Sequence, residues 1–236
     1  MGIPIAAISI VDAIANDLRT RVFAGELTAD VPLTETDMAT RYGVARPTAK
    51  AAIERLVGEG LLVRGLHKTA RVKELGPDAV RDIYLARAYM ESEIVRRLAA
   101  TSRVPADAVA ANREIAALTG SSPLDLVDPD MRFHTALIDA VGNDRISFMY
   151  RTLVSEVRLC MTRVQSLNLL GPGLIHTEHQ RILELIAAGD GDGAARLLDD
   201  HLGRARERLV DALGGEAGPE AGLPIPSTVP TLPDSE

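Results

Sequence analysis

The chain is poor in the residues on which several classes of protein depend. It holds one cysteine, Cys160, so no disulfide can form within it, and the apolar helical setting of that thiol favours a buried structural role over catalysis. Tryptophan is absent and there are only three phenylalanines and four tyrosines, which argues against binding single-stranded nucleic acid by base stacking. No apolar run approaches the roughly 18 residues of a membrane span. The stretch 3–14 lacks a basic leader and contains Asp12, so we expect a cytoplasmic protein with no membrane partner.

Length and composition favour two domains. Hydrophobic residues make up 46% of the 236 residues, which is enough for two modest cores. The composition changes after Glu74-Leu75-Gly76-Pro77, and from Gly214 onward Gly, Pro, Ser, Thr and Glu predominate. We therefore predict domains at 1–74 and 79–213, a linker at 75–78, and a disordered tail at 214–236.

The stretch from residue 33 to residue 62 predicts two short helices joined by a tight turn. Thr34, followed three residues later by Asp37, is typical of a capped helix start, and Gly43 supplies the turn. The second helix is expected to begin near Arg46, because Pro47 is tolerated in a first helical turn. A further helix over residues 11–23 would pack behind these two and complete a three-helix head.

A basic hairpin is predicted to follow. Residues 60–63 and 69–72 have the pattern of two short strands, and the turn between them carries basic residues. From Arg41 to Lys73 there are eight Lys or Arg residues against two glutamates, an excess of six positive charges in a chain whose net charge is −7. Phosphate contacts require such an excess, so helix-turn-helix and hairpin together predict a winged DNA-binding head.

The remainder, from Asp78 to about Gly214, has helical periodicity with short breaks, which predicts about six antiparallel helices. The fold class expected for the chain is therefore mainly α. It consists of an N-terminal winged helix-turn-helix, with three helices and a small β-wing, followed by an all-α antiparallel bundle.

Four side chains that can bind metal occupy apolar faces of the predicted bundle helices. Asp130 and His134 lie one turn apart on one stripe, and His179 and His201 lie on the apolar stripes of the last two helices. A single histidine on an apolar helix face is more often a hydrogen-bonded core residue than a metal ligand. Together, three imidazoles and a carboxylate around a divalent ion would satisfy all four groups, because burying an unpaired carboxylate is costly. Zinc suits this set best, with nickel, cobalt and manganese as alternatives.

Arg87 is the other polar residue on an apolar face. Its guanidinium needs a carboxylate, and Glu91, one turn on, can supply a structural ion pair, whereas a bound ligand is the alternative. Arg158 is a weaker candidate for the same pocket. Asn143 is a further candidate, although its position just after Gly142 is typical of a helix cap. His176 falls outside these patterns and is expected to be solvated or to cap its helix.

The chain resembles the GntR-type winged-helix regulators, in the branch with an all-helical FCD effector domain. The segments that carry this resemblance in the head are Leu33-Thr34-Glu35, Met38-Ala39, Gly43-Val44-Ala45-Arg46, Lys50-Ala51-Ala52-Ile53 and Glu59-Gly60-Leu61. Ala45 departs from the family pattern by replacing a capping Ser or Thr, and Lys50 departs from it by replacing an Arg. Lysine lacks the bidentate fork of arginine, so the operator of relatives cannot be carried over.

The resemblance implies roles for particular residues. In the family an acidic residue and a histidine one turn apart, with histidines in the last two helices, hold a metal, which corresponds to Asp130, His134, His179 and His201. A family arginine that receives a carboxylate effector corresponds to Arg87. The DNA contacts expected from the head are Thr36, Arg46, Thr48, Lys50, Arg64, His67 and Lys68.

We therefore expect a ligand-responsive transcription regulator, a repressor rather than an enzyme. It would be a homodimer on a palindromic operator, because two heads related by a two-fold axis read such a site. Two alternatives stay open at this point: a metal-dependent enzyme that uses the Asp/His cluster, and a winged-helix module that binds another protein.

Overall fold

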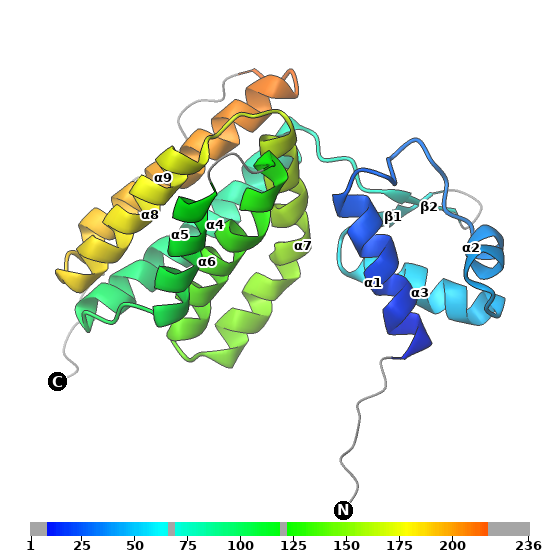
Figure 1. Cartoon of the computed structure of the whole chain (residues 1–236), viewed down its shortest axis with the longest axis horizontal. Helices are drawn as coiled ribbons and strands as arrows, with labels where there is room; N and C mark the ends of the chain where they lie inside the picture. The colour runs from blue at the N-terminus through cyan, green and yellow to red at the C-terminus, as the bar shows by residue number, and fades with distance from the viewer. Residues whose placement is uncertain (1–8, 66–68, 119–121, 217–236) are drawn as a thin grey trace, which may run out of the picture.

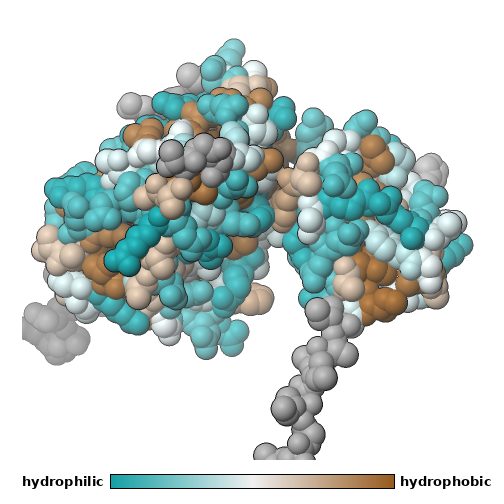
Figure 2. All heavy atoms as spheres, in the orientation of Figure 1, coloured by the Kyte–Doolittle hydropathy of each residue, from teal (hydrophilic) through white to brown (hydrophobic). Residues whose placement is uncertain are grey.

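The computed structural model describes residues 9–65, 69–118 and 122–216. Two hydrophobic cores form, one among residues 14–72 and the other among residues 80–210. We call the first part the head and the second the bundle; they are separate masses that meet over a narrow zone (Figures 1 and 2). The predicted tail beyond residue 216, and the wing residues His67 and Lys68, lie outside the described residues.

In the part of the head that the structure describes there are three helices and a two-stranded antiparallel sheet. Its elements are α1 (Ile10–Phe23), α2 (Glu35–Tyr42), α3 (Arg46–Gly58), β1 (Leu62–Arg64) and β2 (Ala70–Val72). Leu62 pairs with Val72 and Arg64 with Ala70, while Leu33 forms an additional bridge to Ala70. The predicted winged helix-turn-helix is confirmed.

Local sequence explains where the head helices begin and end. The Thr34 hydroxyl accepts the backbone N–H of Asp37 at 3.0 Å and so caps α2. Gly43 follows α2 with φ +63°, the left-handed conformation that a residue without Cβ adopts at least cost. Ala45 precedes α3 without a side-chain cap, and Pro47 lies in the first turn of α3.

The bundle contains six α-helices and one short 3-10 helix within the described residues. They are α4 (Pro77–Ala100), α5 (Ala106–Ala117), η2 (Pro123–Leu126), α6 (Val127–Ala140), α7 (Asp144–Ser166), α8 (Pro172–Ala187) and α9 (Gly191–Ala212). The long helices α4 and α9 pack along each other, and α5 packs against α6 and α8. Because α4 begins at Pro77, the last two residues of the predicted linker are already helical.

Helix α7 lies on the side of the bundle that faces the head (Figure 1). Its Glu156 forms an ion pair with Lys73, which follows β2. Gly60, at φ +73°, lies so close to Glu156 that an added Cβ would be 3.2 Å from Cγ of that residue. Leu159 of α7 packs against the core of the head. Head and bundle are thus joined by side chains as well as by the connecting chain.

Two further features of the described residues concern the membrane and the single cysteine. Among the described helices, none is both long and apolar enough to cross a bilayer. Cys160 is a free, buried thiol, and burial raises its pKa to about 12. The thiol is therefore protonated near neutral pH, as expected of a structural residue.

Candidate functional site

The centre of the bundle brings together the four predicted metal-binding side chains. Asp130 and His134 come from α6, His179 from α8 and His201 from α9. Each offers one ligand atom, and these atoms all lie within 4.8 Å of one another among buried residues. We call these four residues the Asp/His centre.

Two glutamates orient the imidazoles of the Asp/His centre. The Oε2 atom of Glu91 lies 2.6 Å from Nδ1 of His134, and the Oε2 atom of Glu178 lies 2.8 Å from Nδ1 of His201. A carboxylate at Nδ1 favours the tautomer that carries its proton there, which leaves Nε2 with a free lone pair. In both histidines it is Nε2 that faces the centre, and carboxylates commonly hold metal-binding histidines in this way.

The inner atoms of the centre have few partners of their own. Both Asp130 carboxylate oxygens and Nε2 of His134 are buried without a hydrogen bond among the described residues. His179 Nε2 lies 3.3 Å from His201 Nε2 and 3.6 Å from Asp130 Oδ1. The His179 ring is held by stacking on Phe133, with ring centroids 3.6 Å apart.

Burial also disfavours the charged form of two of the imidazoles, His179 and His201. Burial and the neighbouring imidazoles lower the pKa of His179 well below its usual value, and burial lowers the pKa of His201. Neutral imidazoles can donate lone pairs to a cation, whereas protonated ones cannot. Three imidazole nitrogens and one carboxylate are a donor set that fits a divalent transition metal.

Arg87 lies next to this centre and is fully enclosed, with 1% of its surface exposed. Its Nε donates to Glu91 Oε1 at 2.8 Å, so the ion pair considered from the sequence is present. The hydroxyl of Tyr150 donates to the same oxygen at 2.8 Å. Although burial raises the pKa of Glu91, the positive charge of Arg87 and the hydrogen bonds with Arg87 and His134 outweigh it and hold the pKa below its usual range. Nη2 of Arg87 is buried without a partner among the described residues.

The other predicted effector residues lie elsewhere. Arg158 forms an ion pair with Asp128, and its guanidinium carbon lies 4.7 Å from the centroid of the Phe23 ring in the head. The Asn143 side-chain oxygen accepts two backbone N–H groups and caps α7. Among the described residues, neither contacts the Asp/His centre or Arg87.

The expectation for His176 needs correction. This histidine is half-buried rather than solvated, and its Nδ1 lies 3.1 Å from the backbone oxygen of Asn112. The amide of Asn112 in turn donates to the backbone oxygen of His176 at 3.3 Å. His176 therefore links α8 to α5.

The head presents its unpaired cations at the start of α3. Arg46 and Lys50 are exposed and make no hydrogen bond or ion pair within the described chain, while Thr48 is half-buried between them. Thr36 is exposed on α2. Arg64 differs from these, because its guanidinium contacts both Glu35 and Glu54.

Acidic partners reduce the charge excess predicted for residues 41–73. Arg55 forms ion pairs with Asp12 and Glu59, and Lys73 forms one with Glu156. Of the cations that the structure describes in this stretch, Arg41, Arg46 and Lys50 lie without an acidic partner near the turn between α2 and α3, while Arg71 of β2 donates to backbone oxygens. The N-terminal end of a recognition helix is the part that reaches base edges, so the residual charge lies where DNA contact requires it.

Comparison with known families shows to which family the chain belongs. Residues 10–72 match the family described as bacterial regulatory proteins, gntR family, and residues 82–204 match the FCD domain. The chain belongs to the GntR family and carries an FCD domain. This GntR protein is therefore a DNA-binding transcriptional regulator with an effector-binding domain, and its relatives are regulators rather than enzymes.

One relative and two solved structures show how far the similarity extends along the chain. A candidate regulatory protein of the L-lactate dehydrogenase operon of Escherichia coli strain K12 is 25% identical over 214 residues, which cover 81% of this chain and 83% of that protein. The fold is similar to a candidate GntR regulator from Rhodococcus sp. RHA1, with TM-score 0.71 and 23% identity over 86% of this chain and 98% of that one. It is also similar to the metal-free FCD domain of TM0439, with TM-score 0.51 and 22% identity over 60% of this chain and 99% of that one.

Glu91 offers a test of the bundle interior that is independent of any ligand. Glu91→Gln leaves the buried Arg87 charge without a counter-charge, and we expect the bundle to lose about 3–5 kcal/mol of stability in urea unfolding followed by helix content. Glu93→Gln is the matched control, because Glu93 pairs with Arg97 on the exposed face of the same helix. That change should cost no more than about 1 kcal/mol. Equal losses in the two variants would contradict a special role for Glu91.

Proposed function

We propose that this GntR protein is a repressor that binds a palindromic operator as a homodimer. In this proposal the Asp/His centre binds a divalent transition metal, and a small carboxylate effector controls DNA binding. The observation that carries the proposal is the buried centre itself, in which both carboxylate oxygens of Asp130 and Nε2 of His134 have no hydrogen-bond partner among the described residues. Because an unpaired buried carboxylate is costly, the centre calls for a bound cation.

Two heads related by a two-fold axis would place two copies of α3 in successive major grooves. Arg46, Lys50 and Thr48 would face base edges, since they lie on the first turns of α3. The remaining contacts, to phosphate or to the adjacent groove, are assigned to Thr36, Arg64, His67 and Lys68. Arg64 would have to exchange its contacts with Glu35 and Glu54 for a phosphate.

Arg46→Ala tests base reading by the head. We expect a loss of about 1–3 kcal/mol on the selected operator and a relaxed preference at one base pair. Lys68→Ala should instead weaken cognate and random DNA by similar amounts, with a smaller dependence on salt. Both are measured by fluorescence anisotropy at several salt concentrations. If Arg46→Ala weakens both DNAs equally, Arg46 contacts phosphate only.

The metal proposal rests on the donors of the Asp/His centre. Nitrogen atoms of His134, His179 and His201 with one oxygen of Asp130 suit zinc best, and nickel, cobalt or manganese next. The bound metal would supply positive charge to the bundle interior and leave coordination positions for a further ligand. Glu91 and Glu178 would keep two of the imidazoles in the binding orientation.

Metal binding should be visible in composition and stability. His134→Ala is expected to lower the metal content of protein purified without chelator and to reduce the rise in melting temperature on adding Zn²⁺, because a ligand of the folded state stabilises that state. His176→Ala is the control, since His176 lies on α8 but outside the centre. Elemental analysis and thermal unfolding measure both effects. If wild-type protein holds no stoichiometric metal and its melting temperature does not respond to Zn²⁺, the centre is only a buried polar network.

The effector proposal joins the centre to Arg87. A small carboxylate can place one oxygen at an open metal position, while Nη2 of Arg87, which has no hydrogen-bond partner among the described residues, receives the negative charge. The polar interior favours compact hydroxy or sugar acids over long acyl chains. The name of the Escherichia coli relative refers to L-lactate dehydrogenase, and lactate is a hydroxy acid of this class. DNA binding changes only if the effector prefers one arrangement of the heads over another.

Calorimetric titration of small carboxylates tests this assignment. Lactate, glycolate, gluconate and citrate are compared on wild type, Arg87→Lys and His179→Ala, with lactamide as a neutral analogue. We expect an active acid to bind wild type at least about tenfold more tightly than either variant, because a lysine lacks the guanidinium fork and loss of His179 weakens the metal site. Equal binding to all three proteins, or effectors that are only uncharged, would refute the proposal.

A further inference from the structure

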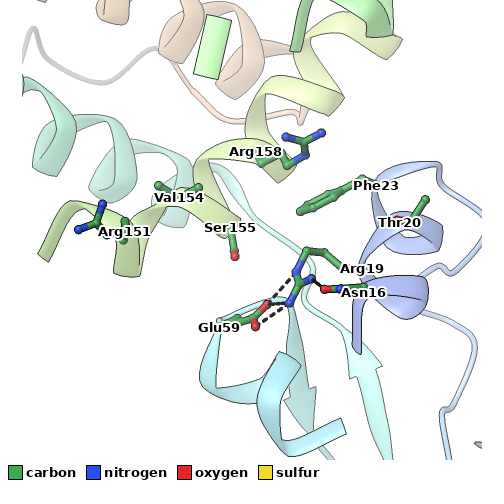
Figure 3. Close-up of a pocket in the computed structure, with 9 residues that line it drawn as sticks. All are labelled: Asn16, Arg19, Thr20, Phe23, Glu59, Arg151, Val154, Ser155 and Arg158. Carbon is green, nitrogen blue, oxygen red and sulfur yellow. Dashed lines mark hydrogen bonds and ion pairs between the residues drawn. The ribbon is translucent and has the colours of Figure 1, made fainter. Parts of the chain in front are cut away.

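A hollow of about 590 Å³ lies between the head and the bundle, away from the Asp/His centre. Figure 3 shows its wall, with side chains of α1 on one side, those of α7 on the other, and Glu59 from the end of α3. This volume is within the range of roughly 300–1,000 Å³ that is usual for sites of small organic ligands. The lining residues are Asn16, Arg19, Thr20, Phe23, Glu59, Arg151, Val154, Ser155 and Arg158.

The charge of the hollow is unevenly distributed. On the head side, Nε and Nη2 of Arg19 donate to the Glu59 carboxylate at 2.7–3.0 Å, so these charges cancel. On the α7 side, Arg151 is 56% exposed and reaches Asp139 only at 3.4 Å. Arg158 uses one nitrogen for Asp128, whereas its Nε is buried without a partner in the described chain. The α7 side therefore has unused capacity to bind an anion.

The hollow also has an apolar surface. The Phe23 ring and the Val154 side chain belong to its lining, and the guanidinium of Arg158 lies over the ring. Thr20 and Ser155 add hydroxyl groups. A compact hydroxy acid would leave the apolar side chains of the hollow in contact with water. An uncharged apolar molecule would leave the Nε of Arg158 without a hydrogen-bond acceptor.

We propose that this hollow is a second ligand site, which takes monocarboxylates with an aromatic or branched aliphatic body. The carboxylate binds Arg158 as a charge-assisted hydrogen-bond donor, and Arg151, at the other end of the α7 wall in Figure 3, adds positive charge to the same side of the hollow. The body of the ligand packs on Phe23 and Val154. The site goes beyond the proposed function and does not use the metal.

This location gives the ligand a physical effect on the whole protein. Its lining comes from α1 and α3 in the head and from α7 in the bundle, so the complete site exists only when the two parts are docked. A ligand that binds only the docked arrangement stabilises it by mass action. It would therefore hold the head in the orientation set by Glu156 and Leu159 of α7.

The test is calorimetric titration of the full chain with benzoate, phenylacetate and 4-methylpentanoate, before and after removal of metal with chelator. Benzamide and inorganic phosphate serve as controls for the apolar body alone and the charge alone. We expect at least one acid to bind about tenfold more tightly than both controls, with the same affinity after chelation. Binding of none of the three acids overturns the proposal. Loss of binding on chelation also overturns it, because the acid then sits at the Asp/His centre.

Paired variants locate the bound acid. Ser155→Phe should fill the hollow and weaken binding at least about tenfold, whereas Thr152→Phe places the same ring on an exposed part of α7 outside the lining. Arg151→Gln should weaken binding, and Arg145→Gln, on an exposed position of the same helix, should not. Thermal unfolding checks that each variant folds. If Ser155→Phe and Thr152→Phe bind the acid equally well, the hollow is not the site. Failure here leaves the metal and effector proposals untouched, since those depend on His134 and Arg87.

Discussion

The buried carboxylate of Glu91 is the constraint on which the bundle interior depends. It lies on α4, yet it binds Arg87 of the same helix, His134 of α6 and Tyr150 of α7. One negative charge therefore compensates a buried guanidinium and at the same time sets the tautomer of a histidine in the Asp/His centre. The charge of Arg87 and the orientation of His134 cannot change independently, because both are set by the same side chain.

Much of this arrangement could be predicted from local sequence. The cap at Thr34 and the turn at Gly43 depend on neighbouring residues, so their patterns locate α2 closely. The convergence of Asp130 and His134 with His179 and His201 was also predictable, because each polar residue interrupts an otherwise apolar helical stripe. Such an interruption indicates burial whatever the detailed packing.

Contacts that depend on how helices pack could not be predicted in the same way. Glu178 precedes His179 and lies off the apolar stripe of α8, so only the packing of α9 against α8 shows that it holds His201. Arg158 has apolar neighbours in the sequence, which suggested that it faces the bundle interior. The head instead packs so that Arg158 lies over Phe23 rather than beside Arg87. The positive charge left over in residues 41–73 was overestimated for a similar reason, since partners of Arg55 and Lys73 come from distant segments.

The close approach of Gly60 to Glu156 limits how the two domains of this protein can be recombined with those of relatives. A chimera cut within residues 75–78 would keep the head of this chain but place a foreign α7 against Gly60 and Lys73. Glu156 and Leu159 lie on α7 of the bundle, but their side chains contact the head. A bundle taken from a relative must therefore carry an α7 surface that fits this head. The modular unit for engineering is therefore the head together with that helix surface.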